Sequence, residues 1–164
     1  MTHMLPISFS LNGQAVSIEI AAHTLLIDLV RDRFGLKGTK RSCDMEVCGA
    51  CTMLVDGQPV SSCTTLAVDV HQREVTTIEG VTPAGGLSRI QKAFVLHGGL
   101  QCGFCTPGFI MSVTALLNEN PHPTDEEIRH HLHGNLCRCT GYVKIIEAVK
   151  SLAAEHASEH ADVV

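Results

Sequence analysis

Apolar and polar residues alternate along the first twenty positions of the chain, as they do in β-strands with one buried face. The apolar positions are Ile7, Phe9 and Leu11 in a first run and Val16, Ile18 and Ile20 in a second. Asn12-Gly13 separates the two runs, and Asn-Gly between alternating runs is a strong signal for a tight hairpin. The chain is therefore expected to open with a β-hairpin.

A helix and three more strands follow in the pattern. Residues 25–34 carry apolar side chains at helical spacing. Residues 53–55 and 58–62 flank Asp56-Gly57, which predicts a second hairpin, and residues 74–78 read as a last strand. Strands on both sides of one helix predict an α+β unit of about 80 residues.

The pattern changes to helical spacing after a Gly- and Pro-containing stretch at residues 79–86, which is typical of a linker. Helices are predicted over residues 87–97 and 108–118. A capping box at Thr124 and Glu127 predicts the start of a third helix. A fourth is indicated by the apolar stripe of Tyr142, Ile145, Ile146, Val149 and Leu152. The predicted domains are residues 1–80, with strands, and residues 81–164, a compact helical bundle.

Composition narrows the class of protein. The apolar fraction of 45% and charged fraction of 18% are typical of a globular chain, and no apolar run is long enough for a membrane span. The net charge is −5 with 12 Lys and Arg, so no nucleic-acid partner is expected.

Residues 1–6 lack the features of a signal peptide, and a cytoplasmic location is therefore expected. The local basic cluster of Lys37, Lys40 and Arg41 is either a solvated loop or a partial compensation for nearby thiolates.

Eight cysteines carry the strongest chemical signal, because patterned cysteines in a cytoplasmic chain more often bind metal than form disulfides. Cys43, Cys48, Cys51 and Cys63 have the spacing C-x4-C-x2-C-x11-C. The first three cysteines match the plant-type [2Fe–2S] spacing, in which one loop supplies three thiolates and a distant cysteine closes the site. Zinc is the alternative, although zinc sites favour two C-x2–4-C pairs separated by a long loop.

A second set comprises Cys102 and Cys105, in a C-x2-C motif, and Cys137 and Cys139, in a C-x-C motif. Helix N-termini are expected to follow Cys105 and Cys139, and they would present free N–H groups and positive dipole ends to anionic sulfur. Spacing alone leaves iron and zinc open for this set. A thioredoxin-like C-x2-C is disfavoured because no βαβ pattern surrounds it. The nearby histidines lie outside the cysteine motifs, which excludes a Rieske-type ligand set and predicts an exposed position on the third helix for His130, His131 and His133.

Four motifs, in order, resemble the small iron–sulfur subunit of the molybdenum hydroxylases, the xanthine oxidase and carbon monoxide dehydrogenase family. They are Gly38-Thr39-Lys40, Cys48-Gly49-Ala50-Cys51, residues 101–108 and residues 134–142. The resemblance covers residues 5–154. The chain departs from the family pattern at Ser42 and Glu46, where relatives usually have glycine. Because glycine adopts a positive φ at low cost, either the loop turns differently here or it accepts strain.

The resemblance implies an N-terminal β-grasp, plant-ferredoxin-like domain followed by a C-terminal four-helix bundle. It implies that all eight cysteines bind two [2Fe–2S] clusters, and that the bundle cluster lies next to a molybdopterin of a large subunit. Gln101 would contact the pterin and Cys139 would be the ligand facing it. A medium subunit with FAD would take up the electrons, in a complex expected to be a dimer of heterotrimers.

The implied function is electron transfer inside an oxidoreductase complex, from molybdopterin through both clusters to flavin. The chain alone is not expected to be catalytic, since it has no P-loop and no G-x-G-x-x-G after a strand. Two alternatives remain: a freestanding two-cluster ferredoxin, which predicts an evenly polar bundle surface, and a zinc-stabilised interaction module, which predicts a colourless protein.

Overall fold

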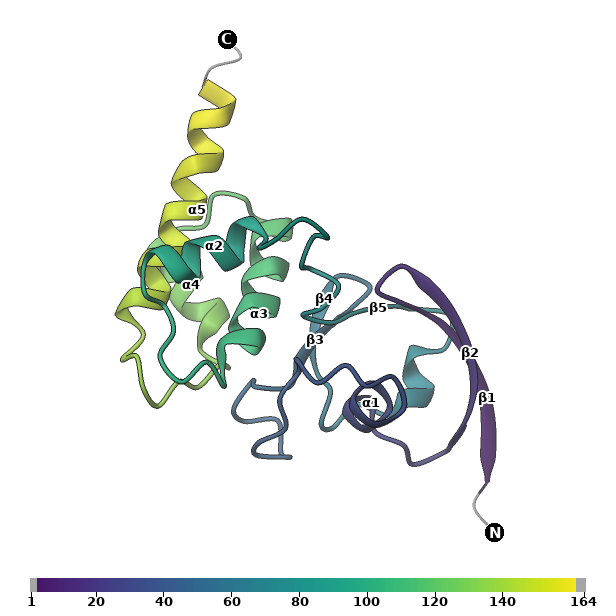
Figure 1. The fold of residues 1–164 in the computed structure, drawn as a ribbon. Helices are drawn as coiled ribbons and strands as arrows, with labels where there is room; N and C mark the ends of the chain where they lie inside the picture. Colours follow the sequence, from purple (N-terminus) through teal and green to yellow (C-terminus); the bar gives the residue numbers. More distant parts are fainter. Residues whose placement is uncertain (1–2, 162–164) are drawn as a thin grey trace.

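The computed structural model describes residues 3–161, with side chains up to residue 153, and combines a five-stranded sheet with helices (Figure 1). The strands are β1 (Met4–Leu11), β2 (Gln14–Ala21), β3 (Thr52–Val55), β4 (Gln58–Ser61) and β5 (Glu74–Thr76). The helices are α1 (Leu26–Asp28), η1 (Leu29–Arg33), η2 (Ala67–Val70), α2 (Arg89–Leu96), α3 (Thr106–Glu119), α4 (Asp125–Leu132) and α5 (Val143–Ala161). The predicted α+β class is confirmed.

Two tight hairpins build most of the sheet, whose strand order is β2-β1-β5-β3-β4. Asn12 and Gly13 both have a positive φ, and so do Asp56 and Gly57. This is the backbone of a type I′ turn, whose twist matches that of the flanking strands. Both predicted hairpins are therefore confirmed. The central contact between β1 and β5 is parallel, whereas all other pairs are antiparallel.

The helix predicted over residues 25–34 is present as one α-helical turn, α1, that runs directly into the π-helical turn η1. Figure 1 shows it lying in the curve of the sheet. Its residues Leu26, Leu29 and Val30 are fully buried against the apolar face of the sheet. The hydrophobic core of the N-terminal half thus lies between this helix and the strands.

The helical half has a core of its own, formed by apolar residues from α2 to α5. The capping box predicted at Thr124 and Glu127 is confirmed at the start of α4. A second capping box, which the sequence analysis did not identify, opens α2 with Ser88 and Gln91. Among the side chains that the structure describes, Phe94 and Phe109 are the largest that are fully buried.

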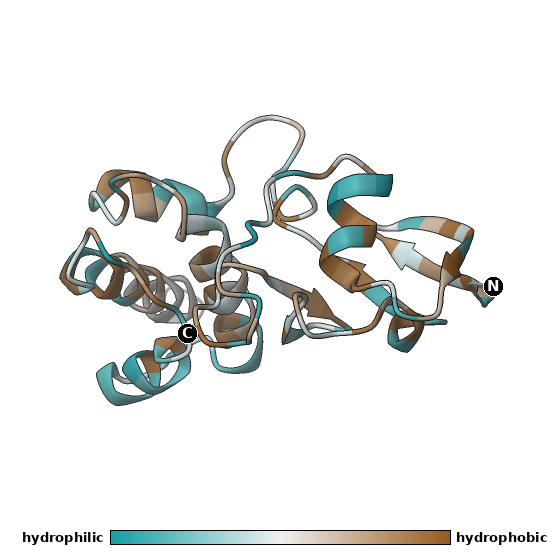
Figure 2. Ribbon diagram, turned by 90° about the horizontal axis from the view of Figure 1, so that it is seen from below, coloured by the Kyte–Doolittle hydropathy of each residue, from teal (hydrophilic) through white to brown (hydrophobic). Residues whose placement is uncertain are grey.

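The two halves meet where α3 packs on the sheet. Leu54 of β3 forms a small buried cluster with Met111 and Ala115 of α3. One turn earlier in α3, Gly108 lies so close to the first cysteine loop that a Cβ there would stand 2.1 Å from the carbonyl oxygen of Gly49. Figure 2 shows hydrophobic stretches running along the strands and alternating with hydrophilic ones on the helices. Within residues 3–161, no helix combines the length and apolar content needed to cross a bilayer.

Candidate metal centres

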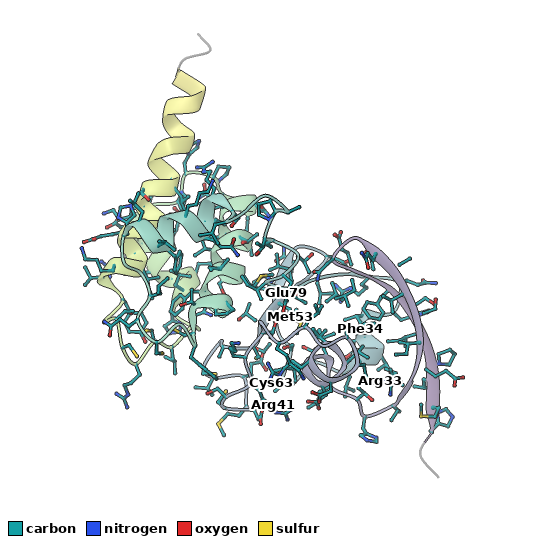
Figure 3. The ribbon with its side chains drawn as sticks, viewed as in Figure 1. Arg33, Phe34, Arg41, Met53, Cys63 and Glu79 are labelled. Carbon is teal, nitrogen blue, oxygen red and sulfur yellow. The ribbon has the colours of Figure 1, made fainter. Side chains whose placement is uncertain are left out.

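The first cysteine set is assembled from two neighbouring segments of the N-terminal half. Cys43 and Cys48 lie half-buried in the long loop between η1 and β3, and Cys51 is buried where that loop enters β3. Cys63 lies two residues after the end of β4, so the hairpin of β3 and β4 returns it to Cys51, and both cysteines pack with Ile27 of α1. Figure 3 shows Cys63 near α1. The sheet register therefore determines where the distant fourth cysteine lies.

The four thiols of this set are arranged as two pairs. Cys48 is the cysteine that helps to lower the pKa of Cys43, and Cys63 packs against Cys51 and helps to raise its pKa. The environments of the pairs differ, because burial raises the pKa of Cys51 to about 12. By contrast, N–H groups of Met45, Val47 and Cys48 donate to the Cys43 sulfur and lower its pKa to about 7, against the effect of burial. This loop thus directs backbone donors at a sulfur, as cluster-binding loops do.

The donors converge because the backbone turns repeatedly in the left-handed region. Asp44, Glu46 and Gly49 all have a positive φ, whereas Ser42 does not. The two departures from the family pattern therefore have different outcomes: Ser42 fits an ordinary backbone, and Glu46 accepts strain at φ +61°. The Glu46 carboxylate partly offsets this by accepting a hydrogen bond from the Thr64 hydroxyl at 3.2 Å, next to Cys63.

We expect Glu46→Gly to stabilise the protein slightly. A non-glycine residue in the left-handed region costs roughly 1–2 kcal/mol, and glycine loses about 0.5–1 kcal/mol more backbone entropy on folding, so the net gain is about 0.5–1 kcal/mol. The thermal midpoint of the iron-loaded protein should rise by about 2 °C. Met45→Gly is the matched control, because Met45 is exposed and has no positive φ, and it should lower the midpoint. A fall for both variants would contradict the strain at Glu46.

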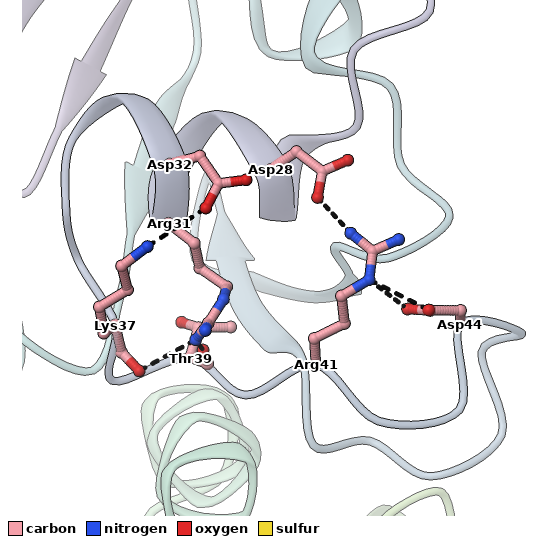
Figure 4. A network of polar contacts seen from close by, with 7 residues as sticks. All are labelled: Asp28, Arg31, Asp32, Lys37, Thr39, Arg41 and Asp44. Atoms are coloured by element: carbon pink, nitrogen blue, oxygen red, sulfur yellow. Dashed lines mark hydrogen bonds and ion pairs between the residues drawn. The ribbon is translucent and has the colours of Figure 1, made fainter.

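Ion pairs fasten the first cysteine loop to the helix beneath it (Figure 4). Arg41 pairs with Asp28 of α1 and, at 2.9 Å, with Asp44 in the loop. Lys37 pairs with Asp32 at 3.2 Å. Each exposed pair adds little stability by itself. These two cations of the local basic cluster have carboxylate partners, which favours the solvated-loop interpretation over compensation for thiolates.

The second cysteine set lies at one end of the helical half and is again divided into pairs. The Cys102 and Cys139 sulfurs are 3.6 Å apart, and Cys137 is the cysteine that helps to raise the pKa of Cys105. The helix expected after Cys105 is α3, which begins at Thr106, two residues before the predicted start, with Cys105 as its N-cap. The helix expected after Cys139 is α5, which begins at Val143 after the positive-φ residues Gly141 and Tyr142.

Thr140 is a contributor to this set that the sequence analysis missed. Its N–H and its hydroxyl lie 3.4 Å and 3.0 Å from the Cys137 sulfur. Burial opposes the ionisation of Cys137, yet the donors from Thr140 and from the Cys139 backbone lower its pKa. Burial raises the pKa of Cys105 to about 12. Threonine after a cysteine is too common a pair to have indicated this contact from sequence.

Both cysteine sets border one hollow of about 520 Å³. It is lined by all four cysteines of the second set, by Cys48 of the first set, and by Ser42 in the first cysteine loop. Cys102, Cys139 and the predicted cofactor contact Gln101 are exposed, whereas Cys137 is buried. Two apolar side chains that line the hollow, Phe104 and Leu136, are unusually accessible, and so are Leu100 and Val143, the sequence neighbours of Gln101 and of the lining residue Tyr142.

The arrangement of the sulfurs favours a cluster over a single ion. Among the residues with described side chains, no three His, Cys, Asp or Glu groups converge closely enough to hold one metal ion. A zinc ion needs four ligands at about 2.0–2.3 Å from one point. Two thiol pairs flanked by N–H donors instead fit a centre with two metal atoms.

Among the described residues, the buried hydroxyl of Thr39 has no hydrogen-bond partner. The next residue, Lys40, donates its N–H to the carbonyl oxygen of Ala50 in the first cysteine loop.

The three histidines near the second set lie on α4 and at its end. His130 and His133 are exposed, as predicted. His131 is only half-exposed, and its Nε2 lies 3.0 Å from the carbonyl oxygen of Ser112 in α3. The expectation of full exposure is therefore wrong for His131, which links two helices. None of the three is placed among the cysteines that line the hollow.

Comparisons with known proteins agree with this geometry. Residues 16–95 match a family model described as "2Fe-2S iron-sulfur cluster binding domain", and residues 77–150 match one described as "[2Fe-2S] binding domain". The nicotinate dehydrogenase small FeS subunit of Eubacterium barkeri is 47% identical over 146 residues, which is 89% of this chain and 93% of that one.

Two solved structures extend the comparison. A chain of quinoline 2-oxidoreductase from Pseudomonas putida 86 superposes with a TM-score of 0.89 at 41% identity, over 98% of this chain and 99% of that one. The aldehyde oxidoreductase of Desulfovibrio gigas has a TM-score of 0.90 at 42% identity, over 95% of this chain but only 18% of the other. The chain therefore belongs to the family of small [2Fe–2S] iron–sulfur subunits of the molybdenum hydroxylases.

Proposed function

We propose that this chain carries single electrons between a molybdopterin site in a large subunit and an FAD in a medium subunit. The observation that supports this most directly is the hollow shared by both cysteine sets, since Cys48 of the first set lines it together with the whole second set. A hollow bordered by both sets places them side by side, as electron exchange between them requires. Their separation in sequence, from Cys63 to Cys102, gives no hint of this proximity.

The proposed ligands are Cys43, Cys48, Cys51 and Cys63 for one [2Fe–2S] cluster and Cys102, Cys105, Cys137 and Cys139 for the other. The pairing of thiols supports two cysteines for each iron atom. When bound, each cluster accepts and releases one electron at a time. The chain itself provides burial, which excludes water, and N–H and O–H donors aimed at sulfur, which stabilise negative charge there.

The exposed edge of the second set is the proposed contact with the large subunit. Gln101 and Cys139 would face the pterin, and the apolar rim around them would be covered by protein. Leu136 and Val143 are 48% and 60% exposed, and side chains of this kind gathered around a functional site are typical of an interface. In the aldehyde oxidoreductase of D. gigas the matching region is continuous with a much longer chain, which supports a large partner at this module.

The same apolar surface argues against a freestanding ferredoxin. That alternative predicts an evenly polar bundle, whereas Val95 and Leu96 of α2 are 58% and 82% exposed in addition to the rim. We therefore favour a heterotrimer of small, medium and large subunits, assembled as a dimer of heterotrimers. A cytoplasmic location is part of the proposal, because free thiols must remain reduced until clusters are inserted.

Residues 1–80 are the proposed β-grasp, plant-ferredoxin-like domain, and residues 81–164 the proposed four-helix bundle. A helix lying across a sheet with a parallel pair at its centre supports the first assignment. The separate core of α2–α5 supports the second.

Metal and sulfide analysis tests the proposal. Anaerobically purified protein should contain about 4 Fe and 4 acid-labile sulfide per chain, since two clusters each have two of both. Reduction with dithionite should give two distinct paramagnetic signals. The native protein should also co-purify with a molybdopterin-containing chain. Colourless protein with zinc would indicate the interaction module, and iron-loaded protein without partners would indicate the freestanding ferredoxin.

A further inference from the structure

The segment before Cys137 lies directly on the loop between Cys48 and Cys51. The N–H of Leu136 donates to the carbonyl oxygen of Cys48 at 2.9 Å. The side-chain Nδ2 of Asn135 donates to the next carbonyl, that of Gly49, at 3.2 Å. Two adjacent hydrogen bonds thus join one cysteine loop to the other, although the loops belong to halves with separate cores.

The amide of Asn135 is held at both ends. Asn135 is only 5% exposed, and its Oδ1 accepts a hydrogen bond of 2.8 Å from the hydroxyl of Ser112, which is 4% exposed on α3. The serine therefore determines which way the amide points, because only Nδ2 is then available to Gly49. A buried polar group that loses its partner costs about 1–3 kcal/mol, so this orientation is well defined.

The surface that Asn135 contacts is equally specific. The Gly49 carbonyl also accepts hydrogen bonds from the N–H of Thr52 at 3.3 Å and from its hydroxyl at 2.8 Å. Gly49 has a φ of +66°, and a Cβ there would stand 2.5 Å from Nδ2 of Asn135. The close approach of the two loops therefore requires glycine at position 49 and a short amide at position 135.

A single backbone hydrogen bond fixes the distance between the two loops at one point but does not fix their relative orientation. The bond from Leu136 alone would let the loops rotate about it, particularly because Leu136 is itself half-exposed. The bond from Asn135 adds a second point one residue away, anchored through Ser112 to the rigid helix α3. Two points of attachment determine both distance and orientation, and Cys137 follows two residues later.

We propose that Asn135, oriented by Ser112, is a positioning residue that fixes the separation of the two cysteine sites and so controls electron transfer between them. This rests on the proposed function, since it requires both sites to be redox-active. Asn135 touches no cysteine sulfur in the hydrogen bonds described. It acts through Gly49 and the loop that holds Cys48 and Cys51.

The test is Asn135→Ala in the complex purified with its partner subunits. Iron and labile sulfide should remain at the wild-type level, because no ligand is removed. The magnetic interaction between the two reduced clusters, measured by electron paramagnetic resonance, should weaken as the loops move apart. Turnover should fall roughly tenfold, the scale seen when outer-shell partners of metal sites are removed. Ser112→Ala, which leaves Asn135 in place, should shift the interaction in the same direction by a smaller amount.

Asn12→Ala provides the matched control. Asn12 also holds a buried partner with both ends of its amide, donating to the Thr77 hydroxyl at 3.0 Å and accepting from the Thr77 N–H at 2.8 Å. This contact lies at the hairpin of β1 and β2, and its hydrogen bonds reach the first cysteine loop only through Glu79, at Gly38, before the first cysteine. The control should lower the thermal midpoint while leaving the magnetic interaction and turnover unchanged.

Several results would overturn the inference. An unchanged magnetic interaction in both Asn135→Ala and Ser112→Ala would show that Asn135 is merely structural. Loss of iron from both variants would make it an assembly residue instead. If wild-type protein shows two coupled signals and both variants show the same coupling, the inference about Asn135 fails while the proposed function stands. If wild-type protein shows no paramagnetic signals, the proposed function itself has failed.

Discussion

Gly108→Ala is expected to destabilise the protein by about 3 kcal/mol, because it places a methyl group where the backbone of the first cysteine loop already lies. A Cβ at position 108 would be 2.1 Å from the Gly49 carbonyl oxygen and 3.2 Å from Cα of Ala50. Neither neighbour is a flexible side-chain end, so α3 and the loop must separate. For a chain of this length the thermal midpoint should fall by about 6–12 °C.

The matched control for this variant is Gly134→Ala. Gly134 belongs to the same junction between the two halves, but a Cβ there would have no atom within 4 Å, and its φ is not in the left-handed region. Its thermal midpoint should stay within about 2 °C of the wild type, since surface substitutions away from special features have small effects. Equal losses for Gly108→Ala and Gly134→Ala would mean that the close approach of α3 to Gly49 is not what joins the halves.

Cys63→Ser is expected to abolish one cluster and spare the other. Cys63 is buried beside Cys51 and Ile27 in the N-terminal half, whereas the second set is supported by the core of α2–α5. Iron should therefore fall from about 4 to about 2 per chain, with one of two paramagnetic signals remaining. Turnover of the complex with a flavin-linked acceptor should be lost, since only one redox site would remain on the route.

Cys105→Ser is the reciprocal variant. It lies at the N-cap of α3 in the other set, and it should remove the other signal while leaving the one that Cys63→Ser abolishes. Loss of both signals from either variant would contradict two independent sites. Retention of about 4 Fe in either variant would contradict the proposed ligand assignment.

The local elements were largely predictable because their causes are local. Asn12-Gly13 and Asp56-Gly57 favour the left-handed backbone that a tight hairpin needs, whatever surrounds them. The capping box at Thr124 and Glu127 is likewise satisfied within four residues. Errors arose where a boundary depends on neighbours in space. The helix over residues 25–34 is an example, because it passes from one α-helical turn into a π-helical turn, which its apolar spacing does not reveal.

The cysteine spacing identified which residues would gather, but only the folded chain paired them. Cys102 and Cys139 are close because α3 and α5 begin at the same end of the helical half, and no spacing rule predicts that choice. The half-exposed position of His131 has the same origin, since its partner is a carbonyl of α3.

The order of strands and helices, the two sets of thiols and the family were determined by the sequence alone, because hydrophobic periodicity, turn residues and metal-ligand spacing act over short stretches of chain. The relation between the two sites was decided by the tertiary structure. Gly49, Ser112 and Asn135 lie far apart in sequence, and they meet only because α3 packs on β3 and brings the loop before Cys137 onto the loop after Cys48. This contact is possible because the backbone of α3 at Gly108 packs closely on the backbone at Gly49. Such distances between segments far apart in the chain cannot be derived from one sequence.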